Sequence, residues 1–169
     1  LPVPVVAMAA DIILDTVGCG IAAWRDDRDK AEIARGLARS FHAAPKATIW
    51  GGGERTDAAV AALANGILVN AADFDDTHKR ALLHTGAVVV PPVLALAGVR
   101  GLTGPELITA IVAGYEVAVR VGMAGMPTHY RFWHSTATNG TFGAAAWAAS
   151  CLGLDARGAL MSLGFAGTQ

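Results

Sequence analysis

One short segment holds most of the residues that could do chemistry in this 169-residue chain. Residues 73–80, Asp-Phe-Asp-Asp-Thr-His-Lys-Arg, are followed by His-Thr-Gly at 84–86, and the flanking sequence is apolar or small. Ionisable groups are costly beside a packed core unless they are paired or used. Histidine is the side chain most easily poised for proton transfer near neutral pH. The segment therefore predicts an acid–base and binding site that includes Asp73, Thr77 and His84.

Three interpretations of this segment remain open on the residues alone. In the first, the carboxylates and imidazoles transfer protons and bind a substrate; Asp73 and Thr77 would share a helix face if the preceding helix continues by one turn. In the second, the segment is a solvated acidic loop, with Lys79 and Arg80 as ordinary charge partners. In the third, two or three carboxylates and a histidine hold a divalent cation. The spacing matches neither an EF-hand loop nor HExxH, so no metal is expected.

A second polar cluster surrounds His134. Residues 131–136, Arg-Phe-Trp-His-Ser-Thr, precede Asn-Gly-Thr-Phe-Gly at 139–143. Small residues and a helix N-terminus after a histidine suit an anionic ligand, because free backbone N–H groups point toward it. Alternatively, His134 caps the helix or packs beside Trp133. The first cluster favours the catalytic interpretation, because two histidine-bearing loops, each leading into an apolar helix, could face one cleft.

Composition argues against several classes of protein. The chain is 53% hydrophobic and 16% charged, with a net charge of −1 and no basic stripe, so nucleic-acid binding is not expected. The uncharged runs 81–99 and 132–154 could span a membrane, but their prolines and polar residues favour buried soluble helices. No basic segment precedes the first apolar helix, so we expect no signal peptide and a cytoplasmic protein. Cys19 and Cys151 are predicted to be buried core thiols.

Helical periodicity runs through the chain, and no alternating strand pattern of any length interrupts it. One all-α domain over 1–169 is therefore expected, with glycine and alanine at the helix contacts and a partner covering its exposed apolar faces. The first helix, 5–21, is apolar on nearly all sides and should be central. Further helices are expected over 28–41, 58–72, 91–99, 107–122, 141–152 and 155–165, with a capping box at 103–106, an extended piece at 47–50 and a loop over 125–137.

These segments together resemble the MmgE/PrpD family, whose members include 2-methylcitrate dehydratase, cis-aconitate decarboxylase and iminodisuccinate epimerase. The resemblance implies that the chain is the first part of a larger helical domain, with an α+β lid beyond it, in a homodimer. It also implies an active site between domains, without metal or organic cofactor, at Asp73, Thr77, His84 and His134, and a lysine just beyond Gln169. The matching segments are ILDTVG at 13–18, ANG at 64–66, DFDDTH at 73–78, HTGAVVVP at 84–91, AGYEV at 113–117 and GTFGAAA at 140–146.

Several positions depart from the family pattern. The family usually has proline where this chain has Thr85, often has proline at Ser135, and commonly has histidine at Asn70. The spacing from Thr77 to His84 is one residue longer than in some members. These changes alter loop shape and substrate contacts, so they bear on the substrate more than on the reaction class.

With the resemblance, the residues predict a cofactor-independent lyase that acts on a small di- or tricarboxylate. Dehydration of a 2-methylcitrate-like substrate is the first expectation; epimerisation of an iminodisuccinate-like dicarboxylate and cis-aconitate-type decarboxylation are alternatives. A non-catalytic dimeric helical protein and a metal-dependent hydrolase are hypotheses from other classes. The candidate catalytic residues are Asp73, His84 and His134, and the candidate substrate-binding residues are Thr77, His78, Lys79 and Arg80.

Overall fold

The computed structural model describes residues 1–41 and 45–168. Within these ranges the chain forms seven α-helices, two 3-10 helices and one short antiparallel ribbon, which confirms the expected all-α fold. The elements are α1 (Val3–Asp26), α2 (Arg28–Ser40), β1 (Ala47–Thr48), β2 (Arg55–Thr56), α3 (Ala58–Val69), η1 (Asn70–Ala72), α4 (Thr85–Arg100), α5 (Gly104–Gly125), η2 (His129–Arg131), α6 (Ser135–Cys151) and α7 (Ala156–Ala166).

Side-chain caps mark the start of four helices. Asp27, Asp57 and Asp155 each accept a hydrogen bond from a backbone N–H in the first turn of α2, α3 and α7. At α5, the Thr103 hydroxyl accepts from the Glu106 N–H while the Glu106 carboxylate accepts from the Thr103 N–H, so the predicted capping box is confirmed. Such caps satisfy backbone donors that the first turn of a helix leaves unpaired.

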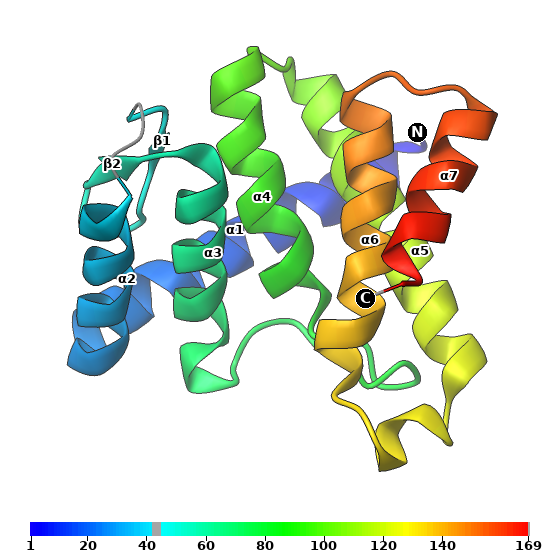
Figure 1. The fold of residues 1–169 in the computed structure, drawn as a ribbon, viewed down its shortest axis with the longest axis horizontal. Coiled ribbons are helices and arrows are strands. Elements are labelled where there is room, and N and C mark those ends of the chain that lie inside the picture. The colour runs from blue at the N-terminus through cyan, green and yellow to red at the C-terminus, as the bar shows by residue number, and fades with distance from the viewer. Residues whose placement is uncertain (42–44, 169) are drawn as a thin grey trace.

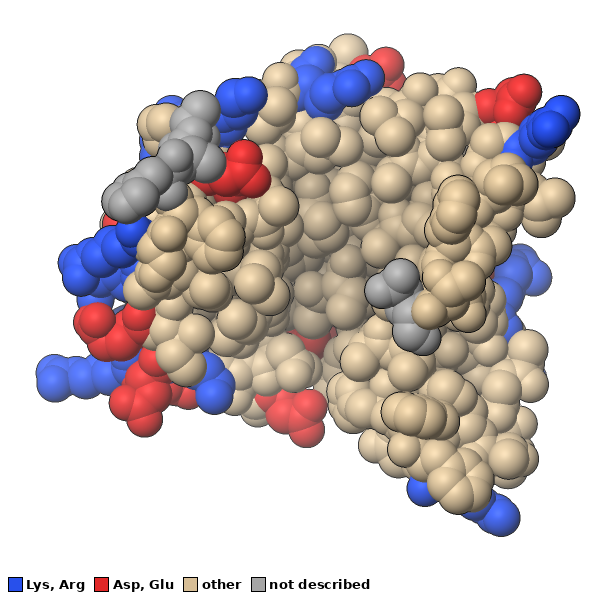
Figure 2. Space-filling model, in the orientation of Figure 1, with Lys and Arg blue, Asp and Glu red and all other residues tan. Residues whose placement is uncertain are grey.

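The helices are arranged so that the start of α4 lies inside the molecule. In Figure 1, α2, α3, α4 and α6 follow one another across the view, while α1 runs behind them. Helix α3 packs against α1, α2 and α4, and helix α6 packs against α4, α5 and α7. Figure 2 shows that the charged side chains of this face lie mainly around its edge, and that its centre is hollow and mostly formed by other residues. Residues at the start of α4 are therefore flanked by α3 and α6.

Apolar clusters and close helix contacts hold this arrangement. A Cβ added at Gly143 of α6 would lie 2.9 Å from both the Cβ of Ala118 and the carbonyl oxygen of Gly114 on α5. The glycine therefore permits a close approach of α5 and α6, as predicted for this composition. The main buried clusters are Ala23, Ala34, Ile49, Ala64 and Leu68 around α1 to α3, and Val89, Val90, Val93, Ala110 and Ile111 between α4 and α5.

The first helix is not central, contrary to the sequence prediction. Large apolar side chains of α1 face outward, with Val3 82% and Leu14 74% exposed. Small side chains form its contact face, because they let the helix lie close to α3, α4 and α5. An apolar pattern on all sides therefore reflects one packed face and one apolar face that is open in this chain. The buried residues of α1 are Ala9, Thr16, Gly20 and Ala23.

Helix α4 begins earlier than predicted. It starts at Thr85 and contains Pro91 and Pro92, instead of starting at the prolines. A proline in a helix interior costs about 3 kcal/mol, whereas full burial of a valine side chain contributes about 1.5–3 kcal/mol. The helix buries apolar side chains on both sides of the prolines, and this burial outweighs their cost. Its fully buried valines are Val89, Val90 and Val93.

Helix α6 also begins earlier than predicted, at Ser135. The expected loop over 125–137 therefore ends at His134, and η2 lies within it. Asn139 and Gly140 have weak helix propensity. Both are buried, and a Cβ at Gly140 would lie 3.0 Å from a Val88 side-chain atom. Packing against α4 thus overrides local propensity.

The two cysteines are free thiols of intermediate exposure, so the prediction that they are buried was wrong. Cys19 lies on the partly open α1, and Cys151 is the last residue of α6. Burial still raises the pKa of both thiols, which lowers the fraction of reactive thiolate.

Among the residues that the structure describes, two helices, α1 and α5, are long and apolar enough to cross a membrane by length and composition. Neither coincides with the uncharged runs 81–99 and 132–154 in the sequence. In the apolar windows of α1 and α5, 17% and 28% of the residues are buried. Core helices of soluble proteins and signal sequences pass the same test, so this is weak evidence for a membrane span. The absence of a membrane partner stays a prediction.

Candidate active site

The acidic segment leaves the helix before its first carboxylate. Helix α3 ends at Val69 and continues as η1, and Asp73 then takes a left-handed backbone conformation with a φ of 52°. Thr77 lies in irregular chain beyond this turn. The helix does not continue by the extra turn that a shared face of Asp73 and Thr77 requires, so these two residues do not share a helix face. Aspartate is one of the few residues that tolerate a left-handed backbone, which allows the chain to turn here.

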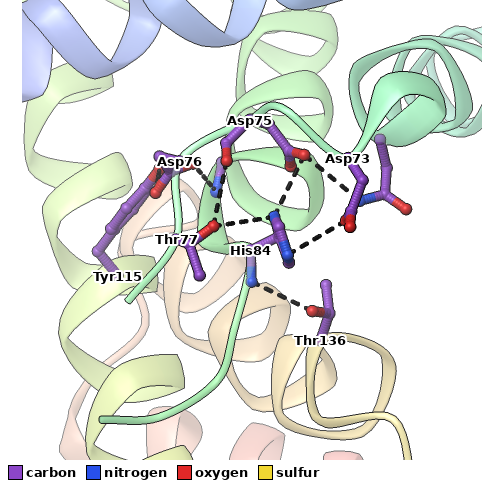
Figure 3. Close-up of polar contacts among 9 residues, drawn as sticks. Asp73, Asp75, Asp76, Thr77, His84, Tyr115 and Thr136 are labelled. Atoms are coloured by element: carbon purple, nitrogen blue, oxygen red, sulfur yellow. Dashed lines mark hydrogen bonds and ion pairs between the residues drawn. The ribbon is translucent and has the colours of Figure 1, made fainter. Parts of the chain in front are cut away.

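His84 lies between two carboxylates (Figure 3). Its Nδ1 is 3.2 Å from Asp75 Oδ1 and 3.4 Å from Thr77 Oγ1. Its Nε2 is 3.4 Å from Asp73 Oδ1. The Asp75 side chain is fully buried, whereas that of Asp73 is 83% exposed. The imidazole therefore faces a buried carboxylate through Nδ1 and an exposed carboxylate through Nε2. The structure brings three of the predicted site residues, Asp73, Thr77 and His84, together.

Asp75 is a site residue to which the sequence analysis assigned no role. Its Oδ1 is close to His84 and also accepts a hydrogen bond from Asn70 Nδ2 at 3.4 Å. Burial raises the pKa of Asp75, and the nearby His84 is the largest opposing influence. The signal was present, because Asp75 stands in the middle of the DFDDTH segment. Residue type alone could not tell which of its three carboxylates is buried.

The variant Asp75→Asn should alter how stability depends on pH. The folded-state pKa of Asp75 lies above the ordinary value of 3.8, so the folded state binds this proton more readily than the unfolded state does. The resulting stabilisation is fully present below pH 3.8 and is lost as the pH rises through the folded pKa. Asparagine does not titrate, so the free energy of unfolding of the variant should increase with pH relative to wild type across that window. Urea unfolding at a series of pH values measures this difference, and parallel curves would contradict it.

His84 and His134 occupy equivalent positions on neighbouring helices. His84 is the N-cap of α4 and His134 is the N-cap of α6, and neither helix has a side-chain cap bond. The His84 backbone N–H donates to Thr136 Oγ1 at 3.1 Å, and the Ser135 hydroxyl donates to the Leu82 carbonyl oxygen. The two histidine-bearing loops are thus bonded to each other, and each leads into a helix, as the sequence suggested. Thr136, two residues after His134, is a contact that the sequence analysis missed.

A groove of about 740 Å³ opens between α3 and α6, over α4. Figure 2 shows this region as the hollow centre of the face. His134 lines the groove, as do Asn70 at the end of α3 and Lys30 of α2, and most other lining residues are small and apolar. This volume is in the range of small-molecule sites. His84 is outside the lining, so the groove and the His84 cluster are adjacent parts of one region, joined through Thr136.

His78, Lys79 and Arg80 lie in a tight turn. The His78 backbone N–H donates to the Leu83 carbonyl oxygen at 2.9 Å, and the Ala81 N–H donates to His78 Nδ1 at 3.2 Å. The His78 imidazole therefore helps to close the turn, and Lys79 and Arg80 are exposed within it. A substrate-binding role for these three residues stays a prediction.

Asp73, Asp75 and His84 are also the described residues most suited to a cation. One ligand atom from each lies within 4.8 Å of the others. Carboxylate oxygens and imidazole nitrogens bind divalent ions such as Mn²⁺, Fe²⁺ and Zn²⁺. Metal binding and proton transfer are therefore competing uses of the same groups, and a chelator distinguishes them.

The variant Gly86→Ala should destabilise the fold. A Cβ at Gly86, in the first turn of α4, would lie 2.3 Å from Asp76 Oδ1 and 2.7 Å from Thr16 Oγ1. Overpacking of this kind costs about 1–3 kcal/mol, which urea unfolding would measure. Gly98→Ala is the matched control on the same helix, because nothing lies within 4 Å of a Cβ there, and it should stabilise by about 0.5–1 kcal/mol. Equal stability of the two variants would contradict this account.

The comparisons with known proteins agree with the fold and with the motifs. The MmgE/PrpD N-terminal domain model matches residues 1–169. This chain belongs to the MmgE/PrpD family. It is 29% identical over 182 residues to the cis-aconitate decarboxylase-like protein oryM of Aspergillus oryzae, an alignment that covers 100% of the chain and 36% of that protein. The resemblance inferred from the sequence motifs is confirmed.

Two further relatives are named cis-aconitate decarboxylases. The protein from Aspergillus terreus is 28% identical over 176 residues, covering 100% of this chain and 36% of that protein. The human protein is 30% identical over 161 residues, covering 89% of this chain and 32% of that protein. The chain spans about a third of the length of the curated relatives it matches.

The three positions at which the sequence analysis expected another residue, Asn70, Thr85 and Ser135, all lie at the site. Asn70 donates to the buried carboxylate of Asp75. Ser135 donates to the carbonyl oxygen of Leu82, in the turn before His84. Thr85 is fully buried as the first residue of α4. Asn70 and Ser135 therefore contribute hydrogen bonds to the surroundings of His84 in this chain.

Proposed function

We propose that this MmgE/PrpD chain is part of a cofactor-independent lyase that acts on a small di- or tricarboxylate. The observation that carries the proposal is the position of His84, whose ring nitrogens face Asp75 and Asp73 at the start of α4. The start of α6, with His134 as its N-cap, is bonded to the same loop. Two imidazoles and a carboxylate beside a ligand-sized groove are the groups that proton transfer at carbon requires.

The two helix starts favour a polyanionic substrate. Backbone N–H groups in the first turn of a helix attract anions, and the helix dipole adds to this attraction. Helices α4 and α6 both begin here without a side-chain cap, unlike α2, α3, α5 and α7. We assign substrate carboxylates to this region, with Thr77 as a further hydroxyl donor. Lys79 and Arg80 are proposed to neutralise a carboxylate of the substrate when it is bound.

The proposed chemistry passes through a carbanion next to a carboxylate. In decarboxylation, the bond from carbon to the departing carboxylate breaks, CO2 leaves, and the electron pair delocalises into a neighbouring carboxylate. His84 or His134 then donates a proton to carbon and regains one from water, while Asp73 orients the imidazole; Asp73 acts as a base only in the branches that remove a proton from carbon. Proton transfer by a positioned side chain contributes roughly 10²–10⁴-fold. Donors aimed at the developing enediolate oxygen stabilise the transition state further.

The same groups would also serve a dehydratase or an epimerase. A dehydratase removes a proton from carbon and delivers one to a departing hydroxyl, and an epimerase returns the proton to the opposite face. Decarboxylation of cis-aconitate is the branch to test first, because the relatives compared here carry that name. A 2-methylcitrate-like substrate for dehydration and an iminodisuccinate-like substrate for epimerisation remain the alternatives.

Proton NMR of the full-length gene product in D2O tests the proposal. The substrates are cis-aconitate, 2-methylcitrate, citrate and iminodisuccinate, each with and without a chelator. Loss of CO2, new vinyl signals or deuterium uptake at an α-carbon, insensitive to the chelator, would support cofactor-free chemistry and identify the branch. Activity that the chelator abolishes would instead favour a metal at Asp73, Asp75 and His84. No turnover of any substrate would favour the non-catalytic alternative.

We also propose that the full-length protein is a cytoplasmic homodimer. The support is the apolar surface that α1 and α7 leave open, including Met8, Leu14, Leu160 and Phe165. Large exposed apolar side chains gathered on a helix face commonly mark a protein interface. Light scattering of the full-length protein measures the oligomeric state, and a monomer would contradict the proposal.

A further inference from the structure

Asp76 and Tyr115 form a further group of polar contacts, on the side of the loop away from Asp73 (Figure 3). The Asp76 carboxylate accepts a hydrogen bond from the Gly86 backbone N–H at 2.8 Å through Oδ1, and from the Tyr115 hydroxyl at 3.1 Å through Oδ2. The Thr16 hydroxyl reaches the same point, because a Cβ at Gly86 would lie 2.7 Å from it. Helices α4 and α5 and the acidic loop are therefore joined at one carboxylate, and Thr16 of α1 lies beside Gly86.

The two donors match an ionised carboxylate. Such a carboxylate accepts hydrogen bonds and cannot donate them, and here each oxygen receives one bond from a different element. Burial raises the pKa of Asp76 above its ordinary value, and the bonds from Gly86 and Tyr115 oppose this rise without cancelling it. Burial and the nearby Asp76 raise the pKa of Tyr115, so that its hydroxyl remains a neutral donor.

The position of Asp76 in the chain links this cluster to His84. Asp76 stands between Asp75 and Thr77, and both neighbours approach Nδ1 of His84. Gly86 lies two residues beyond His84. The bond from Gly86 to Asp76 therefore closes a loop that contains His84, and the bond from Tyr115 fixes that loop to α5. Supporting hydrogen bonds of this kind hold site residues in a defined geometry.

From this juxtaposition we propose that Asp76 and Tyr115 are positioning residues for His84. Neither needs to touch the substrate, because both act through the loop that bears the imidazole. The proposal deepens the proposed function, and the expected effect on turnover rests on that function. The expected effect on the placement of the His84 ring is independent of it.

The test uses the full-length protein with Tyr115→Phe, and with Tyr130→Phe as the matched control. The chain contains two tyrosines, and Tyr130 is half-exposed in the loop before α6. Tyr115→Phe removes one hydroxyl and should lower kcat roughly ten- to hundredfold while KM changes little, because misplacement of a catalytic group affects the chemical step. It should also shift the ¹H–¹³C NMR signal of the His84 ring, assigned with a His84→Asn variant. Tyr130→Phe should do neither.

Asp76→Asn extends the test to the other partner. Asparagine cannot accept both hydrogen bonds, so this variant should move the His84 signal and lower kcat in the same direction. The double variant with Tyr115→Phe should lose less than the sum of the two single effects, because both act through one contact. Additive losses would overturn the proposal.

The two readouts separate this proposal from the proposed function. If Tyr115→Phe leaves kcat and the His84 signal at their wild-type values and lowers only stability, the positioning role is wrong. If the wild type turns over no carboxylate, the His84 signal still decides. A shift in Tyr115→Phe but not in Tyr130→Phe supports the positioning role although the proposed reaction has failed, and an unmoved signal overturns it.

Discussion

His84→Asn is expected to lower turnover of the full-length protein by roughly 10²–10⁴-fold, the typical contribution of a positioned proton-transfer group. Asparagine keeps a donor near the position of Nδ1, so Asp75 retains a partner and the fold should persist. It has no titratable group at the position of Nε2, which faces Asp73 at 3.4 Å. The rate of product formation, followed by proton NMR, measures the loss, and circular dichroism verifies the fold.

A second substitution and a rescue experiment make this result specific. Glutamine at position 84 places its amide near Nε2 instead of Nδ1, so both variants should be inactive if proton transfer is the role. Imidazole added to the buffer should restore part of the activity of His84→Asn, because it supplies the missing acid. Turnover near wild type in both variants would contradict the proposed role of His84 and would favour a structural ion pair with Asp75.

His134→Ala is expected to lower turnover strongly and to leave the stability unchanged. His134 is exposed and lines the groove, and its recorded hydrogen bonds run from Thr138 to its backbone carbonyl. Truncation of the side chain therefore removes no hydrogen bond or ion pair among the described residues. The loss should fall on kcat, in the range of roughly 10²–10⁴-fold. Steady-state kinetics and thermal unfolding of the same samples measure both quantities.

Tyr130→Phe controls for a change in this loop, because Tyr130 is also exposed and lies four positions before His134. It should keep wild-type activity. An active His134→Ala enzyme would contradict the catalytic assignment and leave His84 as the sole candidate histidine. A His134→Ala protein with both lower stability and lower activity would instead indicate that the imidazole supports the loop.

Much of the site was predictable because its residues are close in sequence. Asp73, Thr77 and His84 fall within a dozen positions, and the structure brings them within hydrogen-bond range of one another through His84. The predicted capping box at Thr103 was also correct, because a cap depends on side chains three residues apart. Local spacing is sufficient for such features.

The errors share one physical cause, which is packing between segments distant in sequence. Helix α4 runs through Pro91 because buried valines on either side outweigh the local cost. Helix α6 includes Gly140 because Val88 of α4 packs against it. The outward face of α1 was misjudged because an apolar pattern does not show which side meets the rest of the chain.

The sequence by itself determined the family, the all-helical class and the segment that carries the acids and the first histidine. Tertiary structure decided which carboxylate is buried and what holds His84 in place. The His84 N–H bonds to Thr136, 52 residues away, and Asp76 bonds to Tyr115, 39 residues away. Neither contact can be predicted from the local spacing of residues, because both form only when α4, α5 and α6 pack together. The sequence therefore showed which residues could do the chemistry, and only the tertiary structure showed how they are arranged.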